Sequence, residues 1–167
     1  SSNYLKSSRT QYDHIKLSVS GNGATDQLAI AFAEDAAVGI DKYDTEKYIS
    51  SSSTVEIFSN VSSDKLSINT LPIKNEEQEV MLGYKATKNG SYTISIDENI
   101  TSFNEITLLD LVESREVNIL EESYSFDISK SETVNNRFKL TFPASVSTSL
   151  TMQNSDKFKV ITDRNKV

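Results

Sequence analysis

The feature that most constrains the fold of this chain is a period of two in its apolar residues, which recurs along the sequence. Successive side chains of a β-strand point to opposite faces, so a strand with one buried face alternates apolar and polar residues. Such alternation occurs at Ile15, Leu17, Val19; Leu28, Ile30, Phe32; Val55, Ile57; Leu66, Ile68; Val80, Leu82, Tyr84; Tyr92, Ile94, Ile96; Ile106, Leu108; Val117, Ile119; Tyr124, Phe126, Ile128; and Phe138, Leu140, Phe142. The pattern predicts about ten short strands.

Turn-forming residues separate these segments, among them Gly21-Asn22-Gly23 and Asn89-Gly90. Asn-Gly favours a type I′ turn, so we expect a hairpin between the segments that end near Ala86 and begin near Tyr92. The stretch from Ala33 to Ser50 is expected to be a long excursion between strands. Short strands without long amphipathic helices between them predict an all-β fold, an antiparallel β-sandwich of the jelly-roll kind.

Charge and composition exclude several classes of function. The chain has 17 Lys and Arg against 24 Asp and Glu, a net charge of −7, so we expect no nucleic-acid binding, which needs clustered positive charge. Without cysteine, it has no disulfides and no Cys-based zinc site. No apolar run reaches the roughly 20 residues that span a bilayer, so we expect no membrane insertion. The start lacks signal-peptide features, and we expect an export signal to lie outside the chain.

An ordered set of short motifs resembles a known family. The set begins at residues 26–32 (Asp-Gln-Leu-Ala-Ile-Ala-Phe) and continues with Gly39-Ile40-Asp41, Glu56-Ile57-Phe58-Ser59, Leu66-Ser67-Ile68-Asn69, Gly90-Ser91-Tyr92-Thr93-Ile94, Ile106-Thr107-Leu108-Leu109-Asp110, Val117-Asn118-Ile119, Tyr124-Ser125-Phe126 and Arg137-Phe138-Lys139-Leu140. In this order the chain resembles the β-sandwich domain that precedes the C-terminal sorting domain in cargo proteins of the bacterial type IX secretion system.

The resemblance implies an accessory, stalk or presentation domain of a larger secreted or cell-surface protein, and it implies no catalytic residues. Its expected partners are neighbouring domains of the same parent protein and, through a downstream sorting domain, the secretion machinery. Residues 1–143 are then the sandwich domain. Residues 144–167 are a linker followed, at Phe158, by the first strand of a truncated sorting domain.

Catalytic constellations are weak in this sequence. His14 is the single histidine, and a Ser-His site would need a nucleophile and an orienting acid around it. The densest carboxylates, Glu76-Glu77 with Glu79, Glu121-Glu122, and Asp110 with Glu113, are typical of solvated turns and strand ends. We therefore predict that the isolated chain is not an enzyme.

Calcium is the one cofactor for which the sequence offers ligands. Asp35, Asp41 and Asp44 lie close together in the predicted excursion, and calcium accepts carboxylate oxygens from irregular loops. Their spacing differs from the Asp-x-Asp-x-Asp-Gly loop of EF-hands. The alternatives are a calcium site and a plain acidic loop.

A carbohydrate-binding module or an adhesion domain is the alternative function, with glycans or surface proteins as partners. Sugar recognition relies on exposed aromatic faces, and most Tyr and Phe residues here fall on the inward side of the alternation. Tyr43, Tyr48 and Phe103 fall outside it and are the candidate ligand residues.

Asp110 is expected to cap the turn that follows it, and Arg137 to pair with an acid on an adjacent strand.

Overall fold

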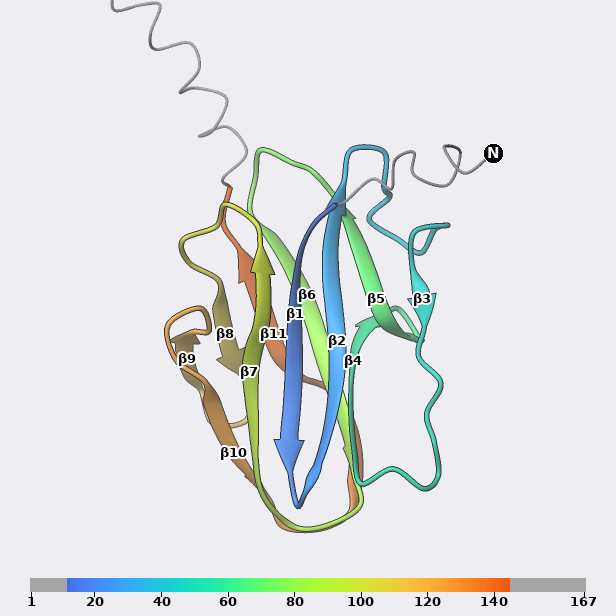
Figure 1. Ribbon diagram of the computed structural model, residues 1–167, viewed down its shortest axis with the longest axis vertical. Coiled ribbons are helices and arrows are strands. Elements are labelled where there is room, and N and C mark those ends of the chain that lie inside the picture. The colour runs from blue at the N-terminus through green and yellow to red at the C-terminus, as the bar shows by residue number, and fades with distance from the viewer. Residues whose placement is uncertain (1–11, 145–167) are drawn as a thin grey trace, which may run out of the picture.

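The computed structural model describes residues 12–144, which form a sandwich-like arrangement of eleven strands and no helix (Figure 1). The strands are β1 (Asp13–Gly21), β2 (Ala24–Ala33), β3 (Thr45–Glu46), β4 (Val55–Val61), β5 (Asp64–Pro72), β6 (Gln78–Ala86), β7 (Gly90–Ile100), β8 (Thr107–Asp110), β9 (Arg115–Asn118), β10 (Tyr124–Ile128) and β11 (Glu132–Phe142). The all-β prediction is confirmed. Within these residues, no helix is available that could cross a membrane.

The strands belong to one continuous sheet in the order β10-β7-β1-β2-β5-β4-β6-β11-β8-β9, and β3 pairs with β5 outside this path. The sheet folds over on itself, so that β7, β1 and β2 lie across the core from β6 and β11 (Figure 1). Every pairing is antiparallel except that of β2 with β5, which is parallel from Ile68 to Pro72. Because β5 pairs with β4 through its first residues, it links the two layers.

The core is built from the alternating residues that the sequence identified. Tyr92, Tyr124, Phe126, Phe138 and Phe142 are all buried, as predicted from their positions in the alternation. Their rings contact one another, and the centroids of Phe126 and Phe138 lie 4.8 Å apart in an edge-to-face arrangement. Burying each such side chain stabilises the fold by roughly 1.5–3 kcal/mol. The interior is therefore one continuous apolar cluster between the layers.

The hairpin predicted at Asn89-Gly90 is wrong. The strands on either side of this sequence do not pair, because β6 lies between β4 and β11 whereas β7 lies between β1 and β10. The connection instead crosses from one layer to the other, held by a hydrogen bond from Asn22 Nδ2 to the Asn89 carbonyl at 3.2 Å. Turn chemistry allows a reversal of the chain, but it does not decide which strand comes next in the sheet.

The type I′ turn lies at Asn22-Gly23, which joins β1 to β2. Both residues have positive φ, 52° for Asn22 and 76° for Gly23, as this turn requires. A second difference concerns Ile68, whose place in the alternation pointed inward but whose side chain is 37% exposed. The pairing of β3 with β5 shifts register between Leu66 and Ile68, and beyond the shift Asn69 and Leu71 are buried instead.

β11, the last strand of the described residues, ends at Phe142. The domain boundary expected after residue 143 stays a prediction. The linker and the strand expected at Phe158 lie outside the described residues.

Candidate interaction surface

Most of the candidate residues lie in the connection between β2 and β4, residues 34–54, which we call the excursion. Lys47 Nζ donates to Asp26 Oδ2 of β2 at 2.5 Å, and the backbone N–H of Ile57 in β4 donates to the same oxygen at 2.8 Å. The backbone N–H of Lys47 donates to the Lys65 carbonyl of β5 at 2.8 Å. Lys47 thus fastens the excursion to β2 and β5.

Two carboxylates of the excursion bind its own backbone. Asp41 accepts hydrogen bonds from the N–H of Ala37 at 2.6 Å and of Tyr43 at 2.8 Å. Asp44 accepts from the N–H of Asp41 and, on β5, from the N–H of Thr70, each at 2.7 Å. These bonds satisfy backbone donors that have no strand partner, which is the usual role of Asp in turns.

The third carboxylate, Asp35, binds a tyrosine. Tyr43 Oη lies 2.6 and 2.7 Å from the two Asp35 oxygens, and the Tyr43 ring packs edge-on against Tyr12 with centroids 5.9 Å apart. The hydrogen bond from Tyr43 lowers the pKa of Asp35, and the same bond raises the pKa of Tyr43 to about 12. Lys42 Nζ lies 5.0 Å from the Tyr43 ring centroid.

The structure brings Asp35, Asp41 and Asp44 into one loop but gives each its own partners. Within residues 12–144, no group of three acidic or histidine side chains is placed to hold a metal ion. Calcium binding by this loop therefore stays a prediction, and the arrangement resembles the alternative of a plain acidic loop, in which each carboxylate serves the local backbone or Tyr43.

Most of the exposed large apolar side chains belong to the excursion or to residues that border it in the fold. Nine large hydrophobic residues are exposed within the described chain, and six of them lie in the excursion, on or directly after β5, or against Tyr43: Tyr12, Val38, Ile40, Tyr48, Ile68 and Ile73. Tyr48 is the most open, at 84% exposed. Clustered exposed apolar side chains on a soluble domain mark interaction surfaces. We call this set the excursion face.

The candidate ligand residues are therefore divided. Tyr43 and Tyr48 belong to the excursion, but Phe103 does not. Its ring is half-buried between Phe32 and Phe142, with both centroids 5.5 Å away, so it extends the core rather than offering an open face. The sequence analysis missed Val38, Ile40 and Ile68 as surface residues. They are exposed, although apolar side chains are usually expected to be buried.

A family model for a domain of unknown function, DUF8693, matches residues 2–142. The chain belongs to this family. Comparisons with curated proteins and with solved structures found no match. The match covers all eleven strands of the DUF8693 domain, including the excursion and both layers of the sheet.

Away from the excursion, the DUF8693 domain contains a buried ionic network around Asp110, and here both sequence predictions are confirmed. Arg137 on β11 donates through Nε and Nη2 to the two oxygens of Asp110 on β8, at 3.0 and 2.9 Å. Asp110 also accepts from the N–H of Val112 at 2.9 Å and of Glu113 at 3.3 Å, which caps the β8–β9 turn. Tyr124 Oη completes the set with a hydrogen bond of 2.8 Å to Asp110.

This network is fully enclosed, with Asp110 at 0% and Arg137 at 5% exposure. Burial alone raises the pKa of Asp110, but the hydrogen bonds from Arg137, Tyr124 and the turn outweigh it and lower the pKa. Burial, and after it the hydrogen bond to Asp110, raises the pKa of the Tyr124 hydroxyl to about 12. The network joins β8, β10 and β11, and Arg137 Nη1 extends it by donating to the Tyr84 hydroxyl of β6 at 3.4 Å.

The remaining carboxylates lie in separate places. Glu76, Glu77 and Glu79 surround the start of β6, and Glu121 and Glu122 occupy the turn after β9. His14 Nε2 lies 3.1 Å from the Glu98 carboxylate on the surface of the β1–β7 pair. These positions agree with the prediction of solvated turns and strand ends. Asp110, for which the same was predicted, lies at a strand end but is enclosed, because Arg137 and Tyr124 cover its carboxylate.

Proposed function

We propose that this chain is a non-catalytic accessory domain of a larger secreted or cell-surface bacterial protein, and that it makes its contacts through the excursion face. Its partners would be neighbouring domains of the same parent or a surface protein. The extracellular location and the link to type IX secretion are carried by the sequence resemblance alone.

One observation supports this function above the others: three exposed apolar side chains, Val38, Ile40 and Tyr48, lie on an excursion that is itself tied to the sheet. Lys47 and Asp26 hold the excursion to β2, and Asp44 holds it to Thr70 of β5. A contact surface that is held in place before binding loses little conformational entropy when a partner binds. The two layers of the sheet pack around one continuous apolar core, and a domain of this kind suits a rigid spacer.

The proposal is tested first by activity. The full chain is assayed against a panel of chromogenic glycosides, esters and peptides, and we expect no turnover above buffer. Turnover that disappears on substitution of one carboxylate, for example Glu79→Gln, would overturn it. Circular dichroism of each variant shows that any loss is not due to unfolding.

The contact surface is tested second. Light scattering over a concentration series measures self-association, and binding to neighbouring domains of the parent is measured by calorimetry once these are expressed. We expect Ile40→Asp to weaken binding at least ten-fold and Val112→Asp, at a still more exposed apolar residue on the β8–β9 turn, to leave it unchanged. Equal effects of the two variants would count against the excursion face.

Glycan binding is the second candidate, and the exposure of Tyr48 favours it. An open aromatic ring offers a flat apolar face on which a sugar can stack. On a glycan array, binding should disappear in Tyr48→Ala and weaken in Tyr43→Ala, while Val112→Ala binds as the wild type does. No signal across a broad panel retires this candidate and leaves the protein contact in place.

A further inference from the structure

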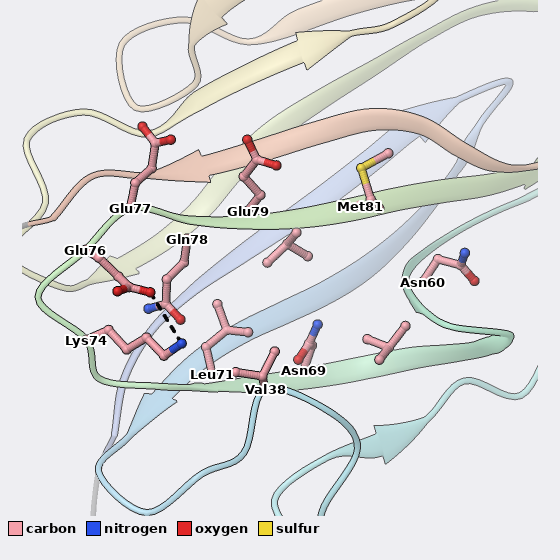
Figure 2. Close-up of a pocket in the computed structure, with 12 residues that line it drawn as sticks. Val38, Asn60, Asn69, Leu71, Lys74, Glu76, Glu77, Gln78, Glu79 and Met81 are labelled. Carbon is pink, nitrogen blue, oxygen red and sulfur yellow. Dashed lines mark hydrogen bonds and ion pairs between the residues drawn. The ribbon is translucent and has the colours of Figure 1, made fainter.

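A cleft of about 300 Å³ lies between β5 and β6, where β6 begins (Figure 2). Its polar side chains are largely paired within the fold. Lys74 pairs with Glu76 at 3.5 Å. Lys139 of β11 pairs with Glu79 at 2.9 Å, and Gln78 donates to the last carbonyl of β5 at 3.0 Å. The cleft therefore leaves few groups for a ligand, whereas the other end of β6 leads to a side chain without such partners.

Residues 87–89, which connect β6 to β7, lead into one of the two Asn-Gly sequences of the chain, Asn89-Gly90. The other is Asn22-Gly23, in the turn between β1 and β2. In an Asn-Gly pair, the backbone nitrogen of the glycine can attack the side-chain carbonyl carbon of the asparagine, because glycine has no Cβ that hinders the approach. The two pairs share this chemistry and differ in their surroundings.

The side chain of Asn22 is held by the fold. Its Nδ2 donates to the Tyr92 hydroxyl at 2.8 Å and to the Asn89 carbonyl at 3.2 Å. Its own peptide is fixed in the type I′ turn that closes the β1–β2 hairpin. Turning the Asn22 amide toward the nitrogen of the next residue would break both hydrogen bonds, so the fold opposes the attack.

The side chain of Asn89 is not held in this way. Its amide makes no hydrogen bond to any residue that the structure describes, and the bond from Asn22 reaches only its backbone carbonyl. Gly90 has a φ of 136°, a conformation that residues with a Cβ rarely adopt. Both asparagines are exposed, so access of water does not distinguish them. Hydrogen bonding of the side chain does.

We propose that Asn89 is a site of spontaneous deamidation in the folded protein and that the fold protects Asn22. The Gly90 nitrogen forms a bond to the side-chain carbonyl carbon of Asn89, and the bond from that carbon to the side-chain nitrogen breaks. The proton of the Gly90 nitrogen passes through solvent to the departing nitrogen, which leaves as ammonia. Water then opens the cyclic imide at either carbonyl, which gives aspartate or isoaspartate. This inference is independent of the excursion face and of the proposed function.

Isoaspartate at position 89 alters the connection between the two layers. Its main chain runs through the former side chain and is longer by one methylene group. The buried Tyr92 donates from its hydroxyl to the Lys88 carbonyl at 2.8 Å, and the added methylene lies between these two residues. Each product also adds one carboxylate to a chain of net charge −7, so ion exchange separates modified from unmodified protein.

The test incubates the full chain at mildly alkaline pH for several weeks. Peptide mapping by mass spectrometry, with isoaspartyl methyltransferase to label isoaspartate, measures the rate at each asparagine. We expect Asn89 to react at least ten-fold faster than Asn22 in the folded protein and the two to react at similar rates in urea, where neither is held. Equal rates in the folded protein overturn the proposal. A ten-fold difference that persists in urea also overturns it, because the sequence rather than the fold would then set the rates.

Ion exchange of two variants is the second measurement. Asn89→Gln keeps an amide, but its longer side chain would have to close a larger and less favourable ring. We expect the acidic species that forms during incubation to fall at least ten-fold in this variant. The control is Asn99→Gln, at an exposed asparagine that isoleucine follows, and it should form as much of the acidic species as the wild type. An acidic species that persists in Asn89→Gln overturns the assignment.

Discussion

Two carboxylate networks of this domain, one around Asp110 and one around Asp35, use the same residue types in opposite environments. Each carboxylate accepts a tyrosine hydroxyl at a similar distance, 2.8 Å from Tyr124 and 2.6 Å from Tyr43. Both tyrosines have a pKa raised to about 12, that of Tyr43 chiefly by its hydrogen bond to Asp35 and that of Tyr124 chiefly by burial and then by Asp110. Asp110 is enclosed by the layers, however, and Asp35 is open to solvent.

The difference teaches that hydrogen-bond length does not rank these networks. When a partner of Asp35 is removed, water takes its place, and little free energy is lost. When a partner of Asp110 is removed, an uncompensated charge is left where water cannot reach it. The buried network should therefore determine the stability of the sandwich, whereas the exposed one shapes a loop whose surface stays available.

The largest expected effect is that of Arg137→Ala. Breaking a buried ion pair by removing one partner costs about 3–5 kcal/mol, and we expect the free energy of unfolding to fall by this amount in urea denaturation. The control is Lys139→Ala on the same strand, whose ion pair with Glu79 is partly exposed and should cost at most about 1 kcal/mol. Similar losses in the two variants would remove the distinction between buried and exposed networks.

Acid stability gives the second comparison. The pKa of Asp110 is lower in the folded protein than in the unfolded chain, so its contribution is present above the ordinary aspartate pKa of about 4 and is lost as the pH falls below it. We expect urea midpoints to fall between pH 5 and pH 2 in the wild type and to fall less steeply in Asp110→Asn.

The matched variant is Asp35→Asn. The pKa of Asp35 is also lowered, by the hydrogen bond from Tyr43, but that group is solvated. The urea midpoint of Asp35→Asn should therefore fall with decreasing pH as steeply as that of the wild type. If Asp35→Asn changed the fall of the urea midpoint at low pH as much as Asp110→Asn does, the excursion would be shown to stabilise the whole domain.

The buried network and most of the core could be predicted from the sequence, because both follow local rules. Alternation placed Phe126 and Phe138 inward, and the strand-end position of Asp110 suggested its capping role, which the structure confirms. Arg137 was assigned an acidic partner on an adjacent strand, and β8 supplies it. Only the identity of that partner was missing, since it depends on strand order.

Strand order itself could not be predicted, and the errors come from it. Asn89-Gly90 has the chemistry of a hairpin turn but joins two layers, and the register shift at β5 turns Ile68 outward. The excursion face was missed for a related reason. Exposure of Val38 and Ile40 depends on which strands lie beneath the loop, and nothing in the local sequence reports that.

Removing one hydroxyl group compares the two networks at a smaller scale. Tyr124→Phe takes one donor from the buried Asp110 and should lower the free energy of unfolding by about 1.5–3 kcal/mol, the range for hydrogen bonds to charged groups. Tyr43→Phe removes the equivalent donor from Asp35 and should leave the urea midpoint unchanged. A loss in Tyr43→Phe as large as that in Tyr124→Phe would mean that the excursion network is shielded from water in solution.

The smallest expected effect is that of calcium on the excursion. Asp41 and Asp44 already accept backbone hydrogen bonds, and Asp35 accepts the Tyr43 hydroxyl, so calcium would have to displace these donors before it could bind. We therefore expect the melting temperature to be the same in calcium and in chelator. A rise in calcium that is lost in Asp44→Asn and retained in Glu122→Gln would instead show that the loop rearranges around the ion. The exposed network would then contribute to stability through a metal rather than through its own hydrogen bonds.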